Sequence, residues 1–357
     1  MSEKKKVLLV LNTINDYRVE TYNIINEQFD LTVAYNVSDS TKNECNFKKY
    51  KIGTKKFGPF NIFGLEFWKL CKKYDAVITS FDIHNFEFSI IPFIKRKYKL
   101  LTWSIGFRCS YVHPYIVNRP HTILDRIAYN ILQAADANIF YMEKAKEFWK
   151  SSKLDFNKIF IAPNTTSIAP SNLNCEKNSI LFVGTLYRGK GVDKLILAFA
   201  EAVKDSKSNI TLDVVGKGEQ SEELKQLAIN LGLSERIIFH GPIYDEKLLA
   251  DKFAKAILCV SPTQAGLTVP KSMGYGVPMV TRRDAITGGE IYHITHGFNG
   301  ILYDRDDELP EILKKAIIKP AALVEMSKNA KKYYNSCALP KHQAQGVIDA
   351  LNYALKN

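Results

Sequence analysis

The chain has 357 residues, which is long for a single hydrophobic core, so we expect two domains. Hydrophobic residues make up 46% of the chain and charged residues 24%, and this globular composition excludes an intrinsically disordered protein. The formal net charge of +12 indicates an anionic partner, and charge alone leaves open whether this is a polyanion, an anionic membrane surface or a phosphorylated ligand.

The cysteines and the N-terminal residues predict a cytoplasmic protein. The six cysteines show no C-x-x-C pair or other metal-like spacing, as expected for reduced thiols. The first residues, MSEKKKVLLVLNTIND, contain an apolar run too short for a signal peptide, and no segment approaches the roughly 18 consecutive apolar residues of a membrane span.

Short β-branched runs alternate with amphipathic stretches along the chain. In the first half the predicted strands are KVLLVL (6–11), LTVAY (31–35), DAVITS (75–80), KLLTWSI (99–105) and ANIFY (137–141). In the second half they are SILFVG (179–184), ITLDVVG (210–216), RIIFHG (236–241), AILCVS (256–261) and VPMVT (277–281), with helices over 192–205 and 221–233. Such alternation is typical of βαβ units and parallel sheets, so we predict an α/β fold.

The predicted boundary between the domains lies in a Pro/Asn/Ser/Thr-rich stretch at 162–178. We expect one doubly wound domain over 1–168, a second over 169–340, and a C-terminal helix over 341–357 that packs back on the first domain. Because ligands of open parallel sheets bind beyond the carboxyl ends of the strands, the loops after the predicted strands are the places to look for a site.

The loop after the strand at 179–184 is the sharpest candidate. It contains Gly184, Arg188, Gly189, Lys190 and Gly191 directly before a predicted helix, so two cations and free helix N–H groups converge there, as a diphosphate requires. The spacing is also that of a P-loop, except that Gly191 replaces the Ser or Thr that would bind Mg²⁺. An NTPase and a purely structural turn therefore remain as alternatives.

A second unusual stretch surrounds Lys271. No Asp or Glu occurs between Asp251 and Asp284, and the stretch includes AGLTVPKSMGYGVPMV (265–280). A bound anion would favour such a stretch, and so would the burial of a strand and a helix, since unpaired charge is costly to bury.

The order of motifs in the second half resembles the retaining family 4 glycosyltransferases, which have the GT-B fold. The motifs are VGTLYRGKG (183–191), LDVVGKGE (212–219), IIFHGPI (237–243), AGLTVPKSMGYGVPMV (265–280), GGE (288–290) and HGFNGILYD (296–304). The resemblance implies two Rossmann-like domains facing a central cleft, with 1–168 binding the acceptor and 169–340 binding a nucleotide sugar. It also implies a donor site formed by residues from several motifs: Gly184, Thr185, Gly216, Pro242, Ile243, Thr263, Gly266, Leu267, Thr268 and Lys271.

Several positions depart from the family pattern. Lys190 keeps the family lysine, but Thr185 stands at the usual arginine position, and Arg188 is the candidate replacement. Thr263 and Lys271 occupy the positions of two glutamates that usually lie eight residues apart. Lys271 cannot accept a hydrogen bond from a ribose hydroxyl, so it binds another group, such as phosphate, or packs. These departures leave open a divergent active enzyme, an altered nucleotide preference or a catalytically silent relative.

Catalytic candidates are Lys190, Arg188, Glu290 and His84. Glu290 either supplies a carboxylate to the site or is a helix N-terminal Glu favoured by the helix dipole. His84 follows a predicted strand together with Asp82, where an acceptor-site role and a plain surface position both fit.

Acceptor-side candidates in the first half are Asn12, Thr13 and Arg18 after the first strand, Asp82, and Arg108 as a contact for an acceptor phosphate.

We therefore expect a hexosyl- or N-acetylhexosaminyltransferase that moves a sugar, with retention, from a UDP-sugar to a glycan or lipid-linked oligosaccharide in bacterial capsule, O-antigen or lipopolysaccharide synthesis. A sugar-nucleotide epimerase of the same fold and a non-catalytic binding subunit are the alternatives. No cofactor or metal is expected, because DRD (304–306) is more readily a helix start than a metal ligand set.

The partners expected besides the donor and acceptor are membrane lipids. Residues 1–170 carry most of the positive charge, and aromatic residues stand beside lysines in 57–74 and 86–99. This pattern predicts peripheral contact with an anionic membrane at its inner face, unless the aromatic residues are core and the lysines merely solvated. No nucleic-acid module is present, so no nucleic-acid partner is expected.

Overall fold

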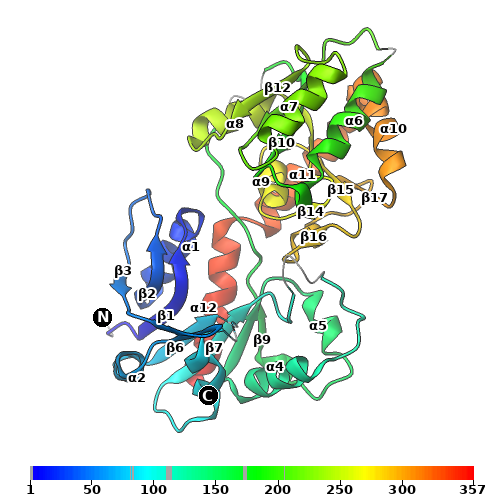
Figure 1. The fold of residues 1–357 in the computed structure, drawn as a ribbon. Helices are drawn as coiled ribbons and strands as arrows, with labels where there is room; N and C mark the ends of the chain where they lie inside the picture. Colours follow the sequence, from blue (N-terminus) through cyan, green and yellow to red (C-terminus); the bar gives the residue numbers. More distant parts are fainter. Residues whose placement is uncertain (1–2, 81, 83, 110–114, 172–174, 205) are drawn as a thin grey trace. The chain divides into compact units, whose positions relative to one another are not determined.

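The computed structural model describes residues 3–80, 82, 84–109, 115–171, 175–204 and 206–357, which form two compact units (Figure 1). Unit 1 contains the described residues of 1–109 and 116–164 together with 339–357, and unit 2 contains Tyr115 and 165–338. Among the helices described, none is long and apolar enough to cross a bilayer.

The described residues of unit 1 form a seven-stranded parallel sheet in the order β3-β2-β1-β6-β7-β8-β9. Its strands are β1 (Lys6–Ile14), β2 (Asp30–Asp39), β3 (Lys48–Lys51), β6 (Ala76–Ser80), β7 (Lys99–Ser104), β8 (Ala137–Phe140) and β9 (Ile159–Ile161). A separate hairpin consists of β4 (Lys55–Phe57) and β5 (Phe60–Ile62). The helices are α1 (Val19–Gln28), α2 (Leu65–Cys71), α3 (Phe86–Ile90), α4 (Ile123–Ala134), α5 (Ala145–Phe148) and α12 (Pro340–Lys356), with 3-10 turns η1 (Asp16–Arg18), η2 (Ile91–Phe93) and η3 (Phe156–Lys158).

The sheet of unit 1 is buried on both faces, which explains the unbroken apolar run of β1. Val7 and Leu9 pack into a cluster with α1 and α12, whereas Leu8 and Val10 pack into another with α2. The C-terminal helix α12 contacts α1 and the strands β7, β8 and β9 (Figure 1). Gly346 permits this contact, because a Cβ there would collide with the Ile161 carbonyl.

The described residues of unit 2 form a six-stranded parallel sheet in the order β12-β11-β10-β13-β15-β17. Its strands are β10 (Ser179–Val183), β11 (Thr211–Val215), β12 (Ile237–Gly241), β13 (Ala256–Val260), β15 (Met279–Arg282) and β17 (Gly300–Tyr303), and β14 (Gln264–Ala265) pairs with β16 (Ile286–Thr287). The helices are α6 (Val192–Val203), α7 (Ser221–Asn230), α8 (Glu246–Lys255), α9 (Thr268–Gly274), α10 (Leu309–Ile318) and α11 (Val324–Cys337), with 3-10 turns η4 (Arg188–Lys190), η5 (Glu290–His293), η6 (Asp306–Glu308) and η7 (Pro320–Leu323).

The predicted α/β fold with two Rossmann-like halves is confirmed, and each predicted strand lies in one of the two sheets. In both sheets the strand order reverses at one place, between β1 and β6 in unit 1 and between β10 and β13 in unit 2. Loops that leave neighbouring strands at such a switch point diverge to opposite faces and open a ligand-sized crevice. The fold therefore directs attention to the loops after β1, β6, β10 and β13.

Candidate functional site

The loop after β10 places Lys190 at the switch point of unit 2. Lys190 ends η4, and Gly191 follows with φ of +64°, a left-handed conformation that starts α6 without a Cβ penalty. A Cβ built on Gly184 would lie 3.6 Å from Lys190 Cε, so the lysine side chain runs back along the end of β10. The free N–H groups at the start of α6 lie directly after Lys190.

The ammonium group of Lys190 is electrostatically unusual. Burial lowers its pKa from 10.5 to about 8, while the nearby Glu290 carboxylate raises it. Among the described residues no carboxylate lies within ion-pair distance of the Lys190 ammonium. A desolvated cation without a close counter-ion is costly to the fold, and such groups mark sites that receive an anion.

Glu290 approaches this lysine from η5. Its carboxylate accepts hydrogen bonds from the Thr287 hydroxyl at 3.0 Å and the Gly288 N–H at 2.8 Å, and the side chain is buried. Glu290 shows the features of both predicted roles. It begins a short helix, and its carboxylate places negative charge near Lys190.

Two threonines join the loops after β10 and β13. The Thr263 hydroxyl donates to the Gly189 carbonyl at 2.6 Å, and the Thr268 hydroxyl donates to the Val183 carbonyl at 3.3 Å. Thr263 thus fixes the loop that carries Lys190, and Thr268 fixes the start of α9 against β10. Gly266 and Leu267 lie between these two contacts.

The remaining predicted donor residues lie around this pair of loops. Gly216, with φ of +151°, packs so tightly on the Gly184 carbonyl that a Cβ would collide with it, and its N–H donates to the Gly241 carbonyl at 2.9 Å. Pro242 and Ile243 directly follow Gly241. The end of β12 is therefore held beside the ends of β11 and β10.

Arg188 and Thr185 are exposed in the same loop. Arg188 lies two residues before Lys190, on the 3-10 turn, and its guanidinium is open to solvent. Its position is compatible with the predicted contact to a diphosphate.

Lys271 pairs with a carboxylate from outside the acid-free stretch. Its Nζ lies 2.7 and 2.6 Å from the two carboxylate oxygens of Glu246, at the first turn of α8. Lys271 thus ties α9 to the helix that follows Pro242 and Ile243.

The carboxylates of DRD are engaged in ion pairs at a helix start. Asp304 pairs with Arg283, and Asp306 pairs with Lys194 and Arg282. Asp306 begins η6, which leads into α10. In the described part of the chain no group of three or more His, Cys, Asp or Glu residues could hold a metal ion.

Two acceptor-side candidates, Asn12 and Asp82, form one polar network in unit 1 with the catalytic candidate His84. Asn12 donates to Asp82 at 3.4 Å, and Asp82 accepts from the His84 N–H and contacts His84 Nδ1, both at 3.0 Å. Asn85 donates to Asn12 at 3.2 Å and to Asp82 at 3.4 Å. Asn12 and Thr13 lie within β1 and not after it as predicted, and Asn12 is thereby joined to the residues that follow β6. The His84 ring is exposed to solvent.

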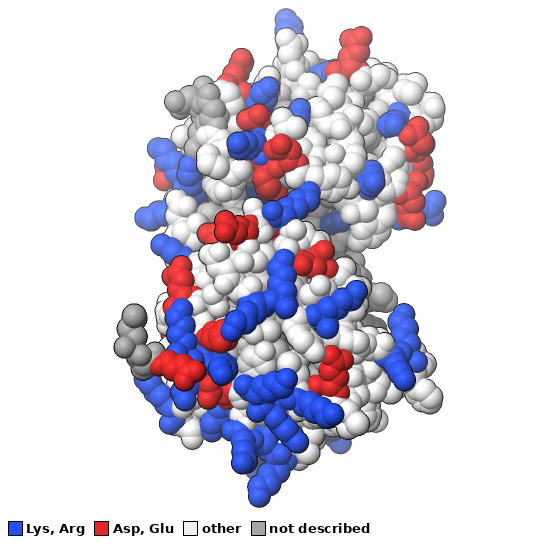
Figure 2. Space-filling model, turned by 90° about the vertical axis from the view of Figure 1, so that its left-hand side faces the viewer, with Lys and Arg blue, Asp and Glu red and all other residues white. Residues whose placement is uncertain are grey.

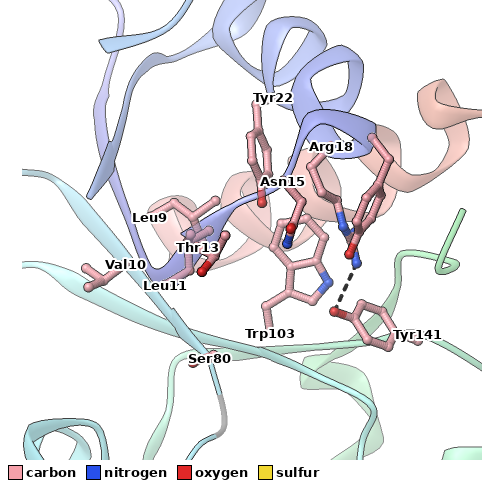
Figure 3. A pocket seen from close by; sticks show the side chains of 11 residues that line it. Leu9, Val10, Leu11, Thr13, Asn15, Arg18, Tyr22, Ser80, Trp103 and Tyr141 are labelled. Atoms are coloured by element: carbon pink, nitrogen blue, oxygen red, sulfur yellow. Dashed lines mark hydrogen bonds between the residues drawn. The ribbon is translucent and has the colours of Figure 1, made fainter. Parts of the chain in front are cut away.

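Thr13 and Arg18 line a cavity beside this network, whereas Arg108 does not (Figure 3). The Thr13 hydroxyl contacts Ser38, and the Arg108 carbonyl accepts from Arg119. The rings of Tyr17, Trp103 and Tyr141 enclose Arg18, and sequence reasoning missed all three. For Trp103, near the end of β7, and Tyr141, just after β8, their position in the sheet was the only available signal, because nothing in the chain links them to residue 18.

The second half of the chain matches the model of a known family. Residues 164–333 match the family model described as glycosyl transferases group 1. The chain is 28% identical over 312 residues to an uncharacterized glycosyltransferase, MJ1069, of Methanocaldococcus jannaschii, an alignment that covers 78% of this chain and 74% of the relative. It is 24% identical over 200 residues to the lipopolysaccharide glucosyltransferase WaaG of Escherichia coli, covering 53% of this chain and 52% of WaaG.

Among solved structures, Anabaena Alr3699/HepE in complex with UDP-glucose superposes with a TM-score of 0.71 at 18% identity, over 98% of this chain and 99% of the other. This similarity establishes the GT-B fold. The family match and the glycosyltransferase relatives confirm the prediction of a glycosyltransferase, and the family match accounts for the motif order in 183–304.

Proposed function

The chain contains a glycosyl transferases group 1 domain and has the GT-B fold. We propose that it is an enzyme that moves a hexosyl or N-acetylhexosaminyl group, with retention, from a UDP-sugar to a glycan or lipid-linked oligosaccharide. The reaction would belong to the synthesis of a bacterial surface polysaccharide. The observation that carries this proposal is the desolvated Lys190 ammonium at the switch point of unit 2. The choice of UDP is supported by the Anabaena neighbour, whose structures contain UDP and UDP-glucose. The surface-polysaccharide role is supported by the similarity to WaaG.

In this proposal Lys190 and Arg188 bind the donor diphosphate, helped by backbone N–H groups at the starts of α6 and α9. The bond between the anomeric carbon and the diphosphate oxygen breaks, and the negative charge that grows on the departing diphosphate is stabilised by these fixed cations. The acceptor hydroxyl bonds to the anomeric carbon, and its proton passes to a diphosphate oxygen. Glu290 keeps Lys190 charged by partly offsetting its desolvation.

The two departures from the family pattern receive structural roles. Thr263 holds the Lys190 loop through the Gly189 carbonyl, and Lys271 neutralises Glu246 at the start of α8. Both contacts stabilise the loops that surround the donor. The proposal thereby favours an active, divergent enzyme over a silent relative.

Unit 1 is proposed to meet the membrane through a strip formed by the β4–β5 hairpin, α3, η2 and α4. These elements contact one another in sequence, and they expose large apolar side chains: Phe57, Phe60, Phe86, Ile90, Phe93, Ile94, Ile123 and Ile127. Lys55 and Lys56 precede the hairpin tip, and Lys95 and Lys97 follow η2. Figure 2 shows Lys and Arg side chains over much of unit 1, in the lower half of the view.

The aromatic residues of 57–99 fall into two groups, one buried and one exposed. Phe63, Phe67 and Phe88 belong to the core, whereas Phe57, which is 74% exposed, and Phe93, which is 60% exposed, face solvent. An apolar strip flanked by lysines suits the interface of an anionic bilayer, where a lipid-linked acceptor resides.

The proposal is tested by thermal stabilisation with a panel of nucleotides and nucleotide sugars. UDP and at least one UDP-sugar are expected to raise the melting temperature of the wild type, and Lys190→Ala is expected to abolish the rise. Lys225→Ala, on the exposed face of α7 and paired only with Glu222 among the described residues, is the matched control. No stabilisation of the wild type by any nucleotide would overturn the proposal.

A second assay separates the enzyme classes. A transferase releases UDP from its donor only when an acceptor is supplied, whereas an epimerase interconverts free nucleotide sugars without one. UDP-sugar binding with neither activity, over a broad acceptor panel, would favour the non-catalytic alternative.

A further inference from the structure

A small cavity of about 140 Å³ opens at the switch point of the unit 1 sheet (Figure 3). Side chains at or just beyond the carboxyl ends of β1, β6, β7 and β8 line it, among them Thr13, Ser80, Trp103 and Tyr141. Arg18 enters it from η1, just before α1. The Asn12–Asp82–His84 network, which joins β1 to the residues after β6, lies at the same switch point.

Arg18 is a buried charge without a counter-ion in the described structure. Its side chain is only 6% exposed, and Nη2 donates to the Asn164 side-chain oxygen at 2.6 Å and to the Tyr141 hydroxyl at 3.1 Å. Among the described residues, none offers a carboxylate oxygen within 4.0 Å of the guanidinium. Asp16, two residues earlier, instead accepts from the N–H groups of Lys42 and Asn43.

Two buried N–H donors at this cavity lack an acceptor. Arg18 Nη1 and Trp103 Nε1 are both shielded from solvent and have no hydrogen-bond partner among the described residues. Trp103 is 7% exposed, and the Arg18 Cζ lies 5.3 Å from its ring centroid. In Figure 3 the Trp103 indole and the Arg18 guanidinium lie side by side at the wall of the cavity. Since both groups only donate, any partner that satisfies them must accept hydrogen bonds.

Water would satisfy the two donors but would not balance the charge. Leaving a buried guanidinium unpaired is costly to the fold, and a ligand anion would remove this cost. No Asp or Glu lines the described cavity, so nothing there repels an anion. Thr13, Asn15, Ser80 and the Tyr22 hydroxyl surround it with groups that suit a sugar ring, and Trp103 provides an apolar face.

We propose that this cavity binds the anionic group of an acidic acceptor, a sugar-linked phosphate or a sugar carboxylate, and that Arg18 and Trp103 Nε1 are the residues that recognise it. This inference rests on the proposed transferase function and gives the chemical class of its acceptor. The cavity is small and open on one side, so only part of an acceptor would lie inside it and the rest would extend outside. Arg18 is thus a specificity residue for acidic over neutral acceptors.

The test uses the indole N–H signals of the full-length protein labelled with ¹⁵N-tryptophan. The chain has three tryptophans, and loss of one signal in Trp103→Phe assigns the Trp103 resonance. Glucose 1-phosphate, inorganic phosphate and glucuronate are titrated at constant ionic strength, with glucose as the neutral control. We expect the Trp103 signal to move with phosphate, carboxylate or both, and not with glucose. Movement with only one anion class identifies the acidic group.

Arg18→Met is expected to weaken binding of the anion by about tenfold or more, because the substitution removes a charge-assisted contact. Tyr141→Phe, which alters only one partner of Arg18, keeps the test informative if Arg18→Met does not fold. Arg126→Met, on the exposed face of α4, is the control. A Trp103 signal that ignores every anion, or one that moves equally in Arg18→Met, overturns the proposal.

Thermal stabilisation by UDP separates the two claims. Wild type and Arg18→Met are both expected to be stabilised by UDP, because the proposed donor site lies in unit 2. Loss of UDP binding in the wild type with a normal Trp103 response would refute the transferase and leave the anion site standing. The reverse result would refute only the acidic acceptor.

Discussion

Replacing Lys190 by Met should stabilise the unliganded protein while it destroys donor binding. The Lys190 pKa is lowered from 10.5 to about 8, and this value already includes the attraction of Glu290. At about 1.4 kcal/mol for each pKa unit, holding the ammonium charged at pH 7 costs the fold at most about 3 kcal/mol. Methionine removes the charge and keeps an apolar chain of similar length.

The expected increase in melting temperature is several degrees, since about 1 kcal/mol corresponds to roughly 2–4 °C in a domain the size of unit 2. The direction in which stability should change with pH follows from the lowered pKa of Lys190. A lysine whose folded pKa is depressed binds fewer protons in the folded than in the unfolded state between pH 8 and 10.5, so wild-type stability rises with pH across that window. The advantage of Lys190→Met is therefore full at pH 7 and shrinks between pH 8 and 10.5.

Differential scanning calorimetry at pH 7 and about pH 10 measures both effects. Lys225→Met serves as the control, because its ammonium is exposed. If Lys190→Met is less stable than the wild type at pH 7, or if its advantage does not depend on pH, Lys190 is an ordinary packing residue and the electrostatic argument fails.

Three further outcomes are expected. EDTA should leave transfer unchanged, because Lys190 and Arg188 are proposed to neutralise the diphosphate; a strict need for Mg²⁺ or Mn²⁺ would return the P-loop interpretation. In chemical denaturation, Gly216→Ala should lower the free energy of unfolding by about 2 kcal/mol or more, because its Cβ would strike the Gly184 carbonyl, and it should abolish stabilisation by UDP. Gly266→Ala is the control: its Cβ would enter open space, so its free energy of unfolding should stay close to that of the wild type. The wild type should bind anionic vesicles in flotation assays. The double variant Phe57→Ser with Phe60→Ser, and the double variant Lys95→Ser with Lys97→Ser, should each lose much of this binding, since each lysine contributes about 1 kcal/mol. Unchanged binding by both double variants would exclude the strip as the membrane-binding surface. Arg96 must be kept, because it bonds to Asp136 and to the carbonyls of Pro92 and Ala134.

The sheets could be predicted because strands buried on both faces consist of continuous apolar runs, as in β1 and β13. Two of the strands that escaped prediction have another character. β3 is an exposed edge strand of sequence KKYK, and β9 has three residues, so neither shows a buried pattern. The β4–β5 hairpin turns at Gly58 with φ of +56°, but its Lys and Phe side chains are exposed and give no alternation.

The parts of the candidate site that depend on residues close together in the sequence could be predicted. The parts that depend on contacts between distant segments could not. The Gly-rich spacing of 184–191 predicts a cation beside a helix start, and Lys190 is there. The partner of Lys271 lies 25 residues away on another helix, so sequence alone could not distinguish a phosphate ligand from an ion pair with Glu246. Arg18 owes its burial to Trp103, Tyr141 and Asn164, which come from three separate segments.

Calorimetric titration of UDP at pH 8, in buffers that differ in ionisation enthalpy, tests the central claim most directly. If Lys190 binds the diphosphate, its pKa of about 8 rises on binding and the protein takes up a fraction of a proton, so the apparent enthalpy varies with the buffer. Lys190→Met should show no such uptake and much weaker binding. Tight UDP binding without proton uptake by the wild type, or with equal uptake in Lys190→Met, would contradict the account.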